Sequence, residues 1–546
     1  MPLYEFTKKN FNDRLKVITK IIGGIGLLFT EYELWPPEGM DMYGISEVPE
    51  YVYNAACSNG SRYMNNDWGV LTAAMYIDAR HEKYDEVYRA RRKALASLAL
   101  AEYLERKGRY IEDIINGIWC ICEESTWELP DGTGRLREPG AVKADVNAAG
   151  TAALLAQTVH LFKKELPLAV KKRAAHEIHI RAAKPFAETK QNVHPELCAQ
   201  NLIACLFSEE DETFRRSIVD KVLELLDGYF DEYAKGRVKA RNEQSLYSRT
   251  AFIFDILEML YNATDRKFEV FSEEKAKLCA DFIYKVHLGS DGFSEKATDA
   301  DGARIYMFGK RMDHKQLMDF GASEFIAIND KTLPDSFNLF HKLYSVKFAS
   351  EIMRYGDNFD GEECGYVDAM DIFVKKTKDF SAAVKGGANA AGNFMIYLDS
   401  DPYVVDLEKS HNLPVINGFS QFTNTKGVKK EKLENGLAVD LSGTYPKEAG
   451  VVSWLRSVEI EEKYVIITDD YELSKLDDLR IILLMKDKPI LSGDRILAGN
   501  GSIVWDGELA LRVELVKSKT YDYVYRLIFH VKSGELKGKI RIALRK

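Results

Sequence analysis

The chain has 546 residues and a mass of 62.0 kDa, with 46% hydrophobic and 29% charged residues, a composition that excludes a disordered chain, a collagen and a coiled-coil rod. At roughly 100–200 residues per domain the length predicts two to four domains, and no apolar run approaches the roughly 20 residues that span a bilayer, which excludes an integral membrane protein. The net charge of −9 disfavours nucleic acid as a partner.

The first part of the chain carries the periodicity of α-helices. Residues 94–104 would be apolar on nearly every face of a helix, and Gly108 follows them. This predicts a buried helix that ends at a glycine. Between residues 218 and 233, apolar residues recur at three- and four-residue spacing with charged residues between them, which predicts an amphipathic helix. Similar patterns predict helices over 110–124, 148–164, 168–186, 200–207, 251–261 and 273–287. Many helices with short connections favour a bundle, a solenoid or a helical toroid.

Beyond about residue 375 the apolar residues recur with a period of two. This alternation predicts strands over 452–460, 509–515, 521–531 and 540–544, with turn signals at 492–494, 499–501 and 533–534. Because the strands follow the helices as a block, the sequence predicts an α+β protein with separate domains. We expect a helical domain over residues 1–375 and an antiparallel β-sandwich over residues 376–546.

The seven cysteines are odd in number and form no Cys-x-x-Cys pair, which predicts reduced thiols in a reducing compartment. The N-terminal segment shows no apolar stretch of the signal-peptide kind. Both features predict a cytoplasmic protein, with export left open.

Two short motifs resemble metal sites but lack required ligands. The histidines His176 and His179 are three residues apart, whereas a zinc-binding helix needs histidines four residues apart with a glutamate between them. Residues 299–302 (Asp-Ala-Asp-Gly) lack the closing glutamate of a calcium loop. The sequence therefore predicts no metal site.

Several longer stretches carry a family resemblance. Residues 385–389 read Lys-Gly-Gly-Ala-Asn, residues 392–399 read Gly-Asn-Phe-Met-Ile-Tyr-Leu-Asp, and residues 411–418 read His-Asn-Leu-Pro-Val-Ile-Asn-Gly. Together with the segments 89–127, 192–201, 243–257 and 449–473, these stretches resemble the heparinase II/III-like polysaccharide lyases, in the same order along the chain.

The resemblance implies an N-terminal (α/α) toroid followed by an antiparallel β-sandwich. It also implies a carbon–oxygen lyase that cleaves a uronic-acid-containing glycan, such as a glycosaminoglycan, by β-elimination. The partner would be an acidic polysaccharide or oligosaccharide, and the reaction consumes no cofactor. Such a site must neutralise the uronate carboxylate, remove the C5 proton and protonate the leaving oxygen.

The resemblance assigns four residues to catalysis. Asn192 stands where the family places the asparagine that neutralises the carboxylate. Tyr247 is the candidate general acid, or both acid and base, and Arg249 would hold the carboxylate or lower the pKa of the tyrosine. His411 is the remaining candidate histidine of the strand region. The alternatives are a surface role for Arg249 and, for His411, hydrogen bonding to backbone near a turn.

The substrate-binding candidates are polar or aromatic residues near these positions. Glu243 and Tyr247 keep the family's Glu-x-x-x-Tyr spacing, and His194 follows Asn192 closely. The other candidates are Trp119, Glu123, Trp127 and Asn389. A core role is the alternative for Trp119, and an exposed loop position is the alternative for His194.

The sequence departs from the family after Asn389. The family carries a His-x-His-x-Asp stretch before its Gly-Asn-Phe, whereas this chain continues directly with Ala-Ala-Gly-Asn-Phe. Some members use those residues for a structural zinc or for catalysis. A non-catalytic or degenerate carbohydrate-binding protein on the same scaffold is therefore the alternative to an active lyase.

Overall fold

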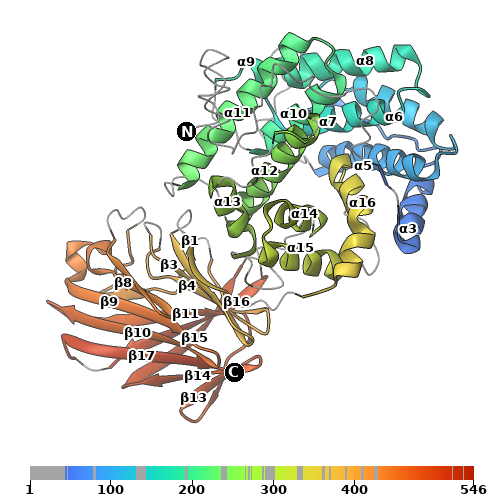
Figure 1. Ribbon diagram of the computed structural model, residues 1–546. Coiled ribbons are helices and arrows are strands. Elements are labelled where there is room, and N and C mark those ends of the chain that lie inside the picture. The colour runs from blue at the N-terminus through green and yellow to red at the C-terminus, as the bar shows by residue number, and fades with distance from the viewer. Residues whose placement is uncertain are drawn as a thin grey trace. The chain divides into compact units, whose positions relative to one another are not determined.

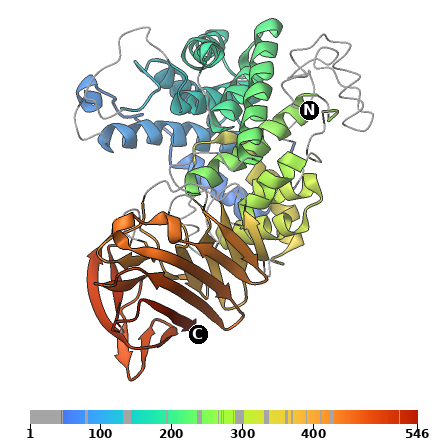
Figure 2. The same cartoon turned by 90° about the vertical axis from the view of Figure 1, so that its left-hand side faces the viewer.

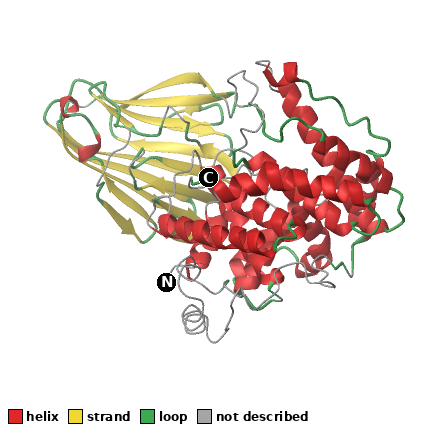
Figure 3. Cartoon of the chain, turned by 90° about the horizontal axis from the view of Figure 1, so that it is seen from above, coloured by secondary structure: helices red, strands yellow, loops and turns green. Residues whose placement is uncertain are grey.

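The computed structural model describes residues 44–45, 47–77, 82–130, 143–190, 195–234, 243–264, 266–268, 271, 274–285, 288, 302–328, 336–358, 363–367, 371–387, 390–407, 411–422, 428–518, 521–532 and 534–546. Helices precede strands along the chain (Figure 1), and Figure 3 distinguishes the two kinds of element by colour. The chain divides into two compact units. The helical unit comprises Met1–Glu232, Tyr247–Ala280 and Asp299–Phe359, and the sheet unit comprises Tyr233–Leu246, Asp281–Thr298 and Asp360–Lys546.

The described helices begin with α3 and end with α16. Their bounds are α3 (Glu50–Ser61), α4 (Ala73–Ile77), α5 (Glu82–Glu105), α6 (Ile111–Cys122), α7 (Val146–Leu161), α8 (Leu168–Ile178), the π-helical segment η1 (His179–Ala183), α9 (Lys184–Glu188), α10 (Pro195–Ser208), α11 (Glu212–Ala234), α12 (Glu243–Ala263), α13 (Glu274–Lys285), α14 (Gly302–Met312), α15 (Lys315–Ile328) and α16 (Leu339–Tyr355). Every helix predicted from periodicity is confirmed. The sequence analysis missed α3, α4, α14, α15 and α16. None of these described helices is long and apolar enough to cross a membrane.

Local sequence explains how several helices begin and pack. Helix α7 begins after Asp145, whose carboxylate accepts hydrogen bonds from the backbone N–H groups of Asn147 and Ala148 at 2.9 and 3.1 Å. Helices α14 and α15 lie side by side (Figure 1) because Gly302 and Gly321 bring their backbones together. A Cβ atom at Gly321 would lie only 2.2 Å from a backbone nitrogen of α14, so no other residue fits there without a shift.

Two buried carboxylates fix helix α12 to its neighbours. Asp255 accepts two hydrogen bonds from Arg304 of α14, both at 2.8 Å, and lies 2.9 Å from His341 Nε2 of α16. One turn further along α12, Glu258 accepts hydrogen bonds from Arg311 and Tyr344, both at 2.7 Å. Because each carboxylate is satisfied by partners on two other helices, α12 is held in one position along its axis. The first turns of this helix carry Tyr247 and Arg249.

The sheet unit contains two antiparallel sheets (Figure 2). The strands are β1 (Glu363–Val367), β2 (Ile372–Lys376), β3 (Phe380–Lys385), β4 (Phe394–Leu398), β5 (Asp401–Val404), β6 (Pro414–Ile416), β7 (Lys430–Leu433), β8 (Gly436–Asp440), β9 (Val451–Ile460), β10 (Tyr464–Leu473), β11 (Leu479–Met485), β12 (Ile490–Ser492), β13 (Arg495–Ala498), β14 (Gly501–Asp506), β15 (Leu509–Lys517), β16 (Tyr523–Val531) and β17 (Lys537–Arg545). A nine-stranded sheet has the order β1-β2-β3-β4-β5-β11-β16-β15, with β6 paired to β11. An eight-stranded sheet has the order β12-β13-β14-β17-β10-β9-β8-β7.

The two sheets share one hydrophobic core. Phe394 and Ile396 of β4 and Leu483 of β11 meet Trp454 and Val458 of β9 in a single cluster of buried residues. The alternation of the sequence explains this burial, since successive side chains of a strand point to opposite faces and the apolar set lies on the inner one. Strands predicted over 452–460, 509–515, 521–531 and 540–544 are confirmed by β9, β15, β16 and β17.

The sheet unit begins earlier than the sequence analysis predicts. Its last segment starts at Asp360, and the expected boundary at residue 375 lies inside β2. Strands β1 and β2 form a hairpin with Val367 opposite Ile372. Each strand has five residues, which is too short for a clear period-two pattern.

The six cysteines of which the structure describes the side chain are all free thiols. Four of them, Cys122, Cys198, Cys205 and Cys279, are buried. Burial raises the pKa of the Cys198 thiol to about 12, so this side chain stays protonated and behaves as a small core residue.

Candidate functional site

Three of the predicted site residues lie on helix α12. Glu243 is its first residue, Tyr247 lies one turn further and Arg249 follows two residues later. The structure describes the backbone of these residues but not their side chains. Asn192, His194 and Asn389 lie outside the described residues. The placement of their functional groups therefore stays a prediction.

Trp119 and Glu123 form an exposed pair at the C-terminal end of α6. The Trp119 indole is 38% exposed, and its Nε1 donates a hydrogen bond of 2.7 Å to the Glu123 carboxylate. The Arg173 guanidinium lies 5.7 Å from the centre of the Trp119 ring. An aromatic face held by polar groups at the surface is a feature that a sugar ring can stack on. The structure thus leaves Trp119 accessible and does not place it in the core.

Trp127 has the opposite environment and is not available to line a cleft. Its side chain is only 1% exposed, and its Nε1 donates to the Ile121 carbonyl oxygen at 2.8 Å. The Arg181 guanidinium lies 5.1 Å from its ring centre. Trp127 is therefore a core residue that fixes the chain after α6, and the prediction that it lines the site is wrong in this structure.

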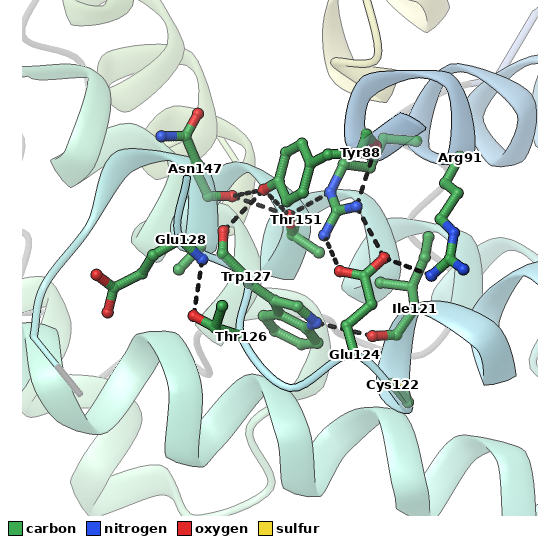
Figure 4. A network of polar contacts seen from close by, with 12 residues as sticks. Tyr88, Arg91, Ile121, Cys122, Glu124, Thr126, Trp127, Glu128, Asn147 and Thr151 are labelled. Carbon is green, nitrogen blue, oxygen red and sulfur yellow. Dashed lines mark hydrogen bonds and ion pairs between the residues drawn. The ribbon is translucent and has the colours of Figure 1, made fainter. Parts of the chain in front are cut away.

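A buried charge network surrounds Trp127 (Figure 4). The Glu124 carboxylate accepts hydrogen bonds from Arg91 at 3.0 Å and from Arg92 at 2.6 and 3.1 Å. The Tyr88 hydroxyl donates to the Trp127 carbonyl oxygen at 2.8 Å, and burial raises the pKa of Tyr88 to about 12. This network joins α5 to the segment after α6, and both guanidinium groups are paired with the Glu124 carboxylate, so its role is structural.

The sheet unit brings together two functional groups around one carboxylate. Asp406 follows β5, and its Oδ1 lies 2.7 Å from Nδ1 of His411, which precedes β6. Its Oδ2 accepts a hydrogen bond of 2.8 Å from the Lys385 ammonium at the end of β3. The Asp406 side chain is 13% exposed and the His411 side chain 34%. We call these three residues the 385–406–411 cluster.

The Asp406 carboxyl is ionised at neutral pH. Its burial acts to raise the pKa, but the hydrogen bond from His411 and the positive charge of Lys385 outweigh this effect, and the pKa lies below its usual value. An ionised carboxylate only accepts hydrogen bonds. The proton between the two side chains therefore belongs to His411 Nδ1.

Asn412 holds the backbone next to His411 in place. Its amide nitrogen donates to the carbonyl oxygens of Phe394 and Val405, both at 2.8 Å, and its amide oxygen accepts from Leu484 N–H at 2.7 Å. Its own backbone N–H donates to Asn393 Oδ1 at 2.8 Å. Asn412 is fully buried, so these bonds fix the segment between β5 and β6 against β4 and β11.

A buried ion pair supports the same segment from the other sheet. Arg456 donates to the Asn412 carbonyl oxygen at 2.6 Å and forms two hydrogen bonds with Asp469, at 2.8 and 2.6 Å. The Trp454 indole also donates to Asp469 at 2.8 Å. Residues that carry the family resemblance in separate stretches, Asn393, Asn412 and Arg456, thus belong to one network.

Sequence reasoning identified His411 but missed its two partners as site residues. Asp406 lies five residues before His411 in a stretch without a local motif, and Lys385 was noted only as part of the 385–389 stretch. A buried carboxylate near a histidine is a signal for a positioned imidazole, but burial is not visible in the sequence at this position.

The described residues contain no group of three or more His, Cys, Asp or Glu side chains that could hold a metal ion. Asp406 and His411 supply two such donors, and the Lys385 ammonium occupies the second carboxylate oxygen. This donor set does not fit a zinc site, which needs at least three protein ligands.

No family model matches the chain, and no curated protein matches it either. Solved structures do match. The heparan sulfate lyase HepC of Pedobacter heparinus, a mutant form, matches with a TM-score of 0.57 and 12% identity over 92% of this chain and 84% of that chain. A heparinase III matches with a TM-score of 0.57 and 11% identity over 100% of this chain and 92% of that chain.

The chondroitin AC lyase of Streptomyces coelicolor, in complex with chondroitin sulphate, matches with a TM-score of 0.56 and 9% identity. That match covers 92% of this chain and 80% of the other. Likeness at such low identity concerns the fold and not the chemistry. The helices and antiparallel sheets of this chain are arranged in the fold of the glycosaminoglycan lyases.

Proposed function

We propose that the protein is a polysaccharide lyase of the heparinase II/III-like kind, which cleaves a uronic-acid-containing glycan by β-elimination. The observation that carries the proposal is the fold likeness to heparan sulfate lyases and chondroitin AC lyase over nearly the whole chain. In this proposal the helical unit is an (α/α) toroid and the sheet unit a β-sandwich. The complex of a chondroitin AC lyase with chondroitin sulphate supports an acidic polysaccharide as the substrate class.

The chemistry requires a neutralised carboxylate, a base and an acid. The C5 proton of a uronate is weakly acidic, so the carboxylate beside it must be held by hydrogen-bond donors before the proton can leave. We assign this task to Asn192 and Arg249. Tyr247 protonates the leaving glycosidic oxygen, and His411 or Tyr247 removes the C5 proton. The anchoring of α12 through Asp255 supports a fixed backbone for the helix that includes Tyr247 and Arg249.

Substrate binding is assigned to groups outside the proton-transfer steps. The exposed Trp119 ring, held by Glu123, offers a face for a sugar ring. Glu243, His194 and Asn389 complete the set. Trp127 is excluded from it because its ring is buried.

The test follows the absorbance of the unsaturated uronate that β-elimination creates. The purified protein is incubated with heparan sulfate, heparin, chondroitin sulfate, hyaluronan, alginate and pectic oligomers. We expect absorbance to rise with at least one of them and Tyr247→Phe to abolish the rise. Tyr464→Phe is the matched control, since Tyr464 is an exposed tyrosine of β10, and it should retain wild-type rates. If the folded wild type produces no rise in absorbance with any of these substrates, the lyase proposal is refuted.

The second candidate is a carbohydrate-binding protein on the same scaffold without turnover. The missing His-x-His-x-Asp stretch after Asn389 favours it. In that case wild type and Tyr247→Phe bind uronate oligomers equally well in calorimetry, and neither produces the unsaturated product. An absorbance rise in the wild type that is lost in Trp119→Ala together with glycan binding would favour the lyase.

A further inference from the structure

We propose that Asp406 and Lys385 are positioning residues for His411, which hold its imidazole with Nδ1 as a hydrogen-bond donor and Nε2 as the proton-accepting atom. What Nε2 does to a substrate rests on the proposed lyase function. The positioning itself stands on the contacts of the 385–406–411 cluster alone.

The first step concerns the tautomer of His411. A neutral imidazole carries one proton, and the nitrogen that bears it is set by the partner of the ring. His411 Nδ1 lies 2.7 Å from Asp406 Oδ1, and this carboxylate is an acceptor only. The proton is therefore on Nδ1, and the lone pair of the neutral ring is on Nε2. The ring is one-third exposed, so it is open to solvent on part of its surface.

The second step concerns the charge of the cluster. A buried carboxylate beside a histidine favours the charged imidazolium, which has no lone pair and cannot act as a base. Lys385 contacts the other oxygen of the same carboxylate at 2.8 Å and supplies a permanent positive charge. Lysine and aspartate then compensate each other, and a neutral His411 leaves the cluster without net charge. Lys385 thus makes the basic form of the histidine compatible with a buried Asp406.

The third step concerns rigidity. The Lys385 N–H donates to the Asn393 carbonyl oxygen at 2.8 Å, and the Lys385 carbonyl oxygen accepts from Gly392 N–H at 2.7 Å. His411 is fixed through the hydrogen bonds of the adjacent Asn412. The three side chains of the cluster therefore extend from backbone that is tied on both sides, as a positioned proton acceptor requires.

The other charged groups near the cluster are paired with partners of their own. Asp371, at the turn before β2, contacts both the Lys430 ammonium and the Tyr366 hydroxyl, so its charge is compensated. Arg456, which reaches the Asn412 carbonyl oxygen, is paired with Asp469. The contacts of the cluster itself are those of Asp406 with His411 and of Lys385 with Asp406.

The experiment reads the His411 ring directly. Protein labelled with nitrogen-15 at its histidines is titrated by NMR, and the His411 signals are assigned by their loss in His411→Gln. In the wild type we expect a protonated Nδ1 and an unprotonated Nε2 once the ring is neutral. Asp406→Asn should give a mixture of tautomers, because an amide can donate as well as accept. A wild-type ring that is protonated on Nε2 would overturn the proposal.

Matched variants separate positioning from folding. Asp478→Asn removes the partner of His530 in an exposed pair at 3.6 Å in the same unit, and it should leave the His411 signals unchanged. Lys385→Arg retains the positive charge and should keep the wild-type tautomer. Lys385→Met removes the hydrogen bond that holds the second Asp406 oxygen, and the His411 ring should then give a mixture of tautomers. A wild-type tautomer in a folded Lys385→Met would refute the role of the lysine.

A kinetic experiment becomes possible once a glycan that the protein cleaves has been found. Asp406→Asn should lower kcat about 100-fold with KM unchanged, since the substrate is not contacted by the carboxylate. Lys385→Met should also lower kcat with KM unchanged, and Lys385→Arg should restore it. If the wild type turns over no glycan, the proposed function fails while the NMR result still decides the positioning. If kcat is retained in Asp406→Asn by an active enzyme, the positioning proposal fails alone.

Discussion

Arg456 and Asp469 face each other across β9 and β10 and form a buried ion pair with two hydrogen bonds. The pair also connects to the 385–406–411 cluster, because the same guanidinium donates to the carbonyl oxygen of Asn412, the residue next to His411. A buried pair of this kind contributes little net stability compared with apolar residues, but removal of one partner leaves a charge without compensation. Its value lies in the single arrangement of strands that satisfies it.

The first prediction concerns this pair. Asp469→Asn should lower the free energy of unfolding of the sheet unit by about 3–5 kcal/mol, because the Arg456 charge stays buried without its counter-charge. Urea unfolding followed by fluorescence and circular dichroism measures the change. Asp470→Asn is the control, since the neighbouring Asp470 is exposed, and it should change stability by less than about 0.5 kcal/mol. Equal effects of the two variants would contradict the structural role of the pair.

The second prediction concerns acid stability. The pKa of Asp406 is lower in the folded protein than its ordinary value of about 3.9. The folded state therefore binds the proton less readily than the unfolded chain, and the carboxylate stabilises the fold above the unfolded pKa. This contribution is lost as the pH falls through the folded pKa. Urea unfolding between neutral pH and acid should show wild type more stable than Asp406→Asn near pH 7 and the difference shrinking in acid. A difference that is constant with pH would contradict the shift.

The third prediction contrasts two tryptophans. Trp127→Ala should destabilise the helical unit by about 3–5 kcal/mol, because it empties a buried site and frees the Ile121 carbonyl oxygen. Trp119→Ala should leave thermal stability nearly unchanged, since this ring is partly exposed, and should raise KM several-fold with kcat unchanged if the ring binds sugar. Trp119→Phe is the control that keeps an aromatic face. Calorimetry and steady-state kinetics separate these outcomes.

The fourth prediction concerns metal removal. Both oxygens of Asp406 are engaged by His411 and Lys385, so the cluster offers no complete ligand set to a cation. Dialysis against a chelator should therefore leave the melting temperature and any lyase rate unchanged. Elemental analysis that finds one zinc per chain, with loss of stability on its removal, would contradict this expectation.

The resemblance and the periodicity together anticipated much of the fold. The helices α5 to α13 and the strands β9, β15, β16 and β17 follow from spacing of apolar residues that is visible within a few neighbours. The helices α14 and α15 were missed; each carries an interior glycine, Gly309 and Gly321, a residue type that disfavours a helix interior. The early strands β1 and β2 were missed because each is too short for a clear alternation.

The candidate site likewise has features that the sequence shows and features that only the structure shows. The sequence by itself determined the order of helices and strands, since this depends on local spacing, and the family resemblance of residues 411–418 marked His411 as a candidate. Only the tertiary structure decided that Trp127 is buried while Trp119 is exposed, and that Asp406 contacts both His411 and Lys385. The reason is physical: burial and charge pairing arise where β3, β5 and β6 are brought together by long-range strand pairing, and no local period encodes which distant side chains then meet.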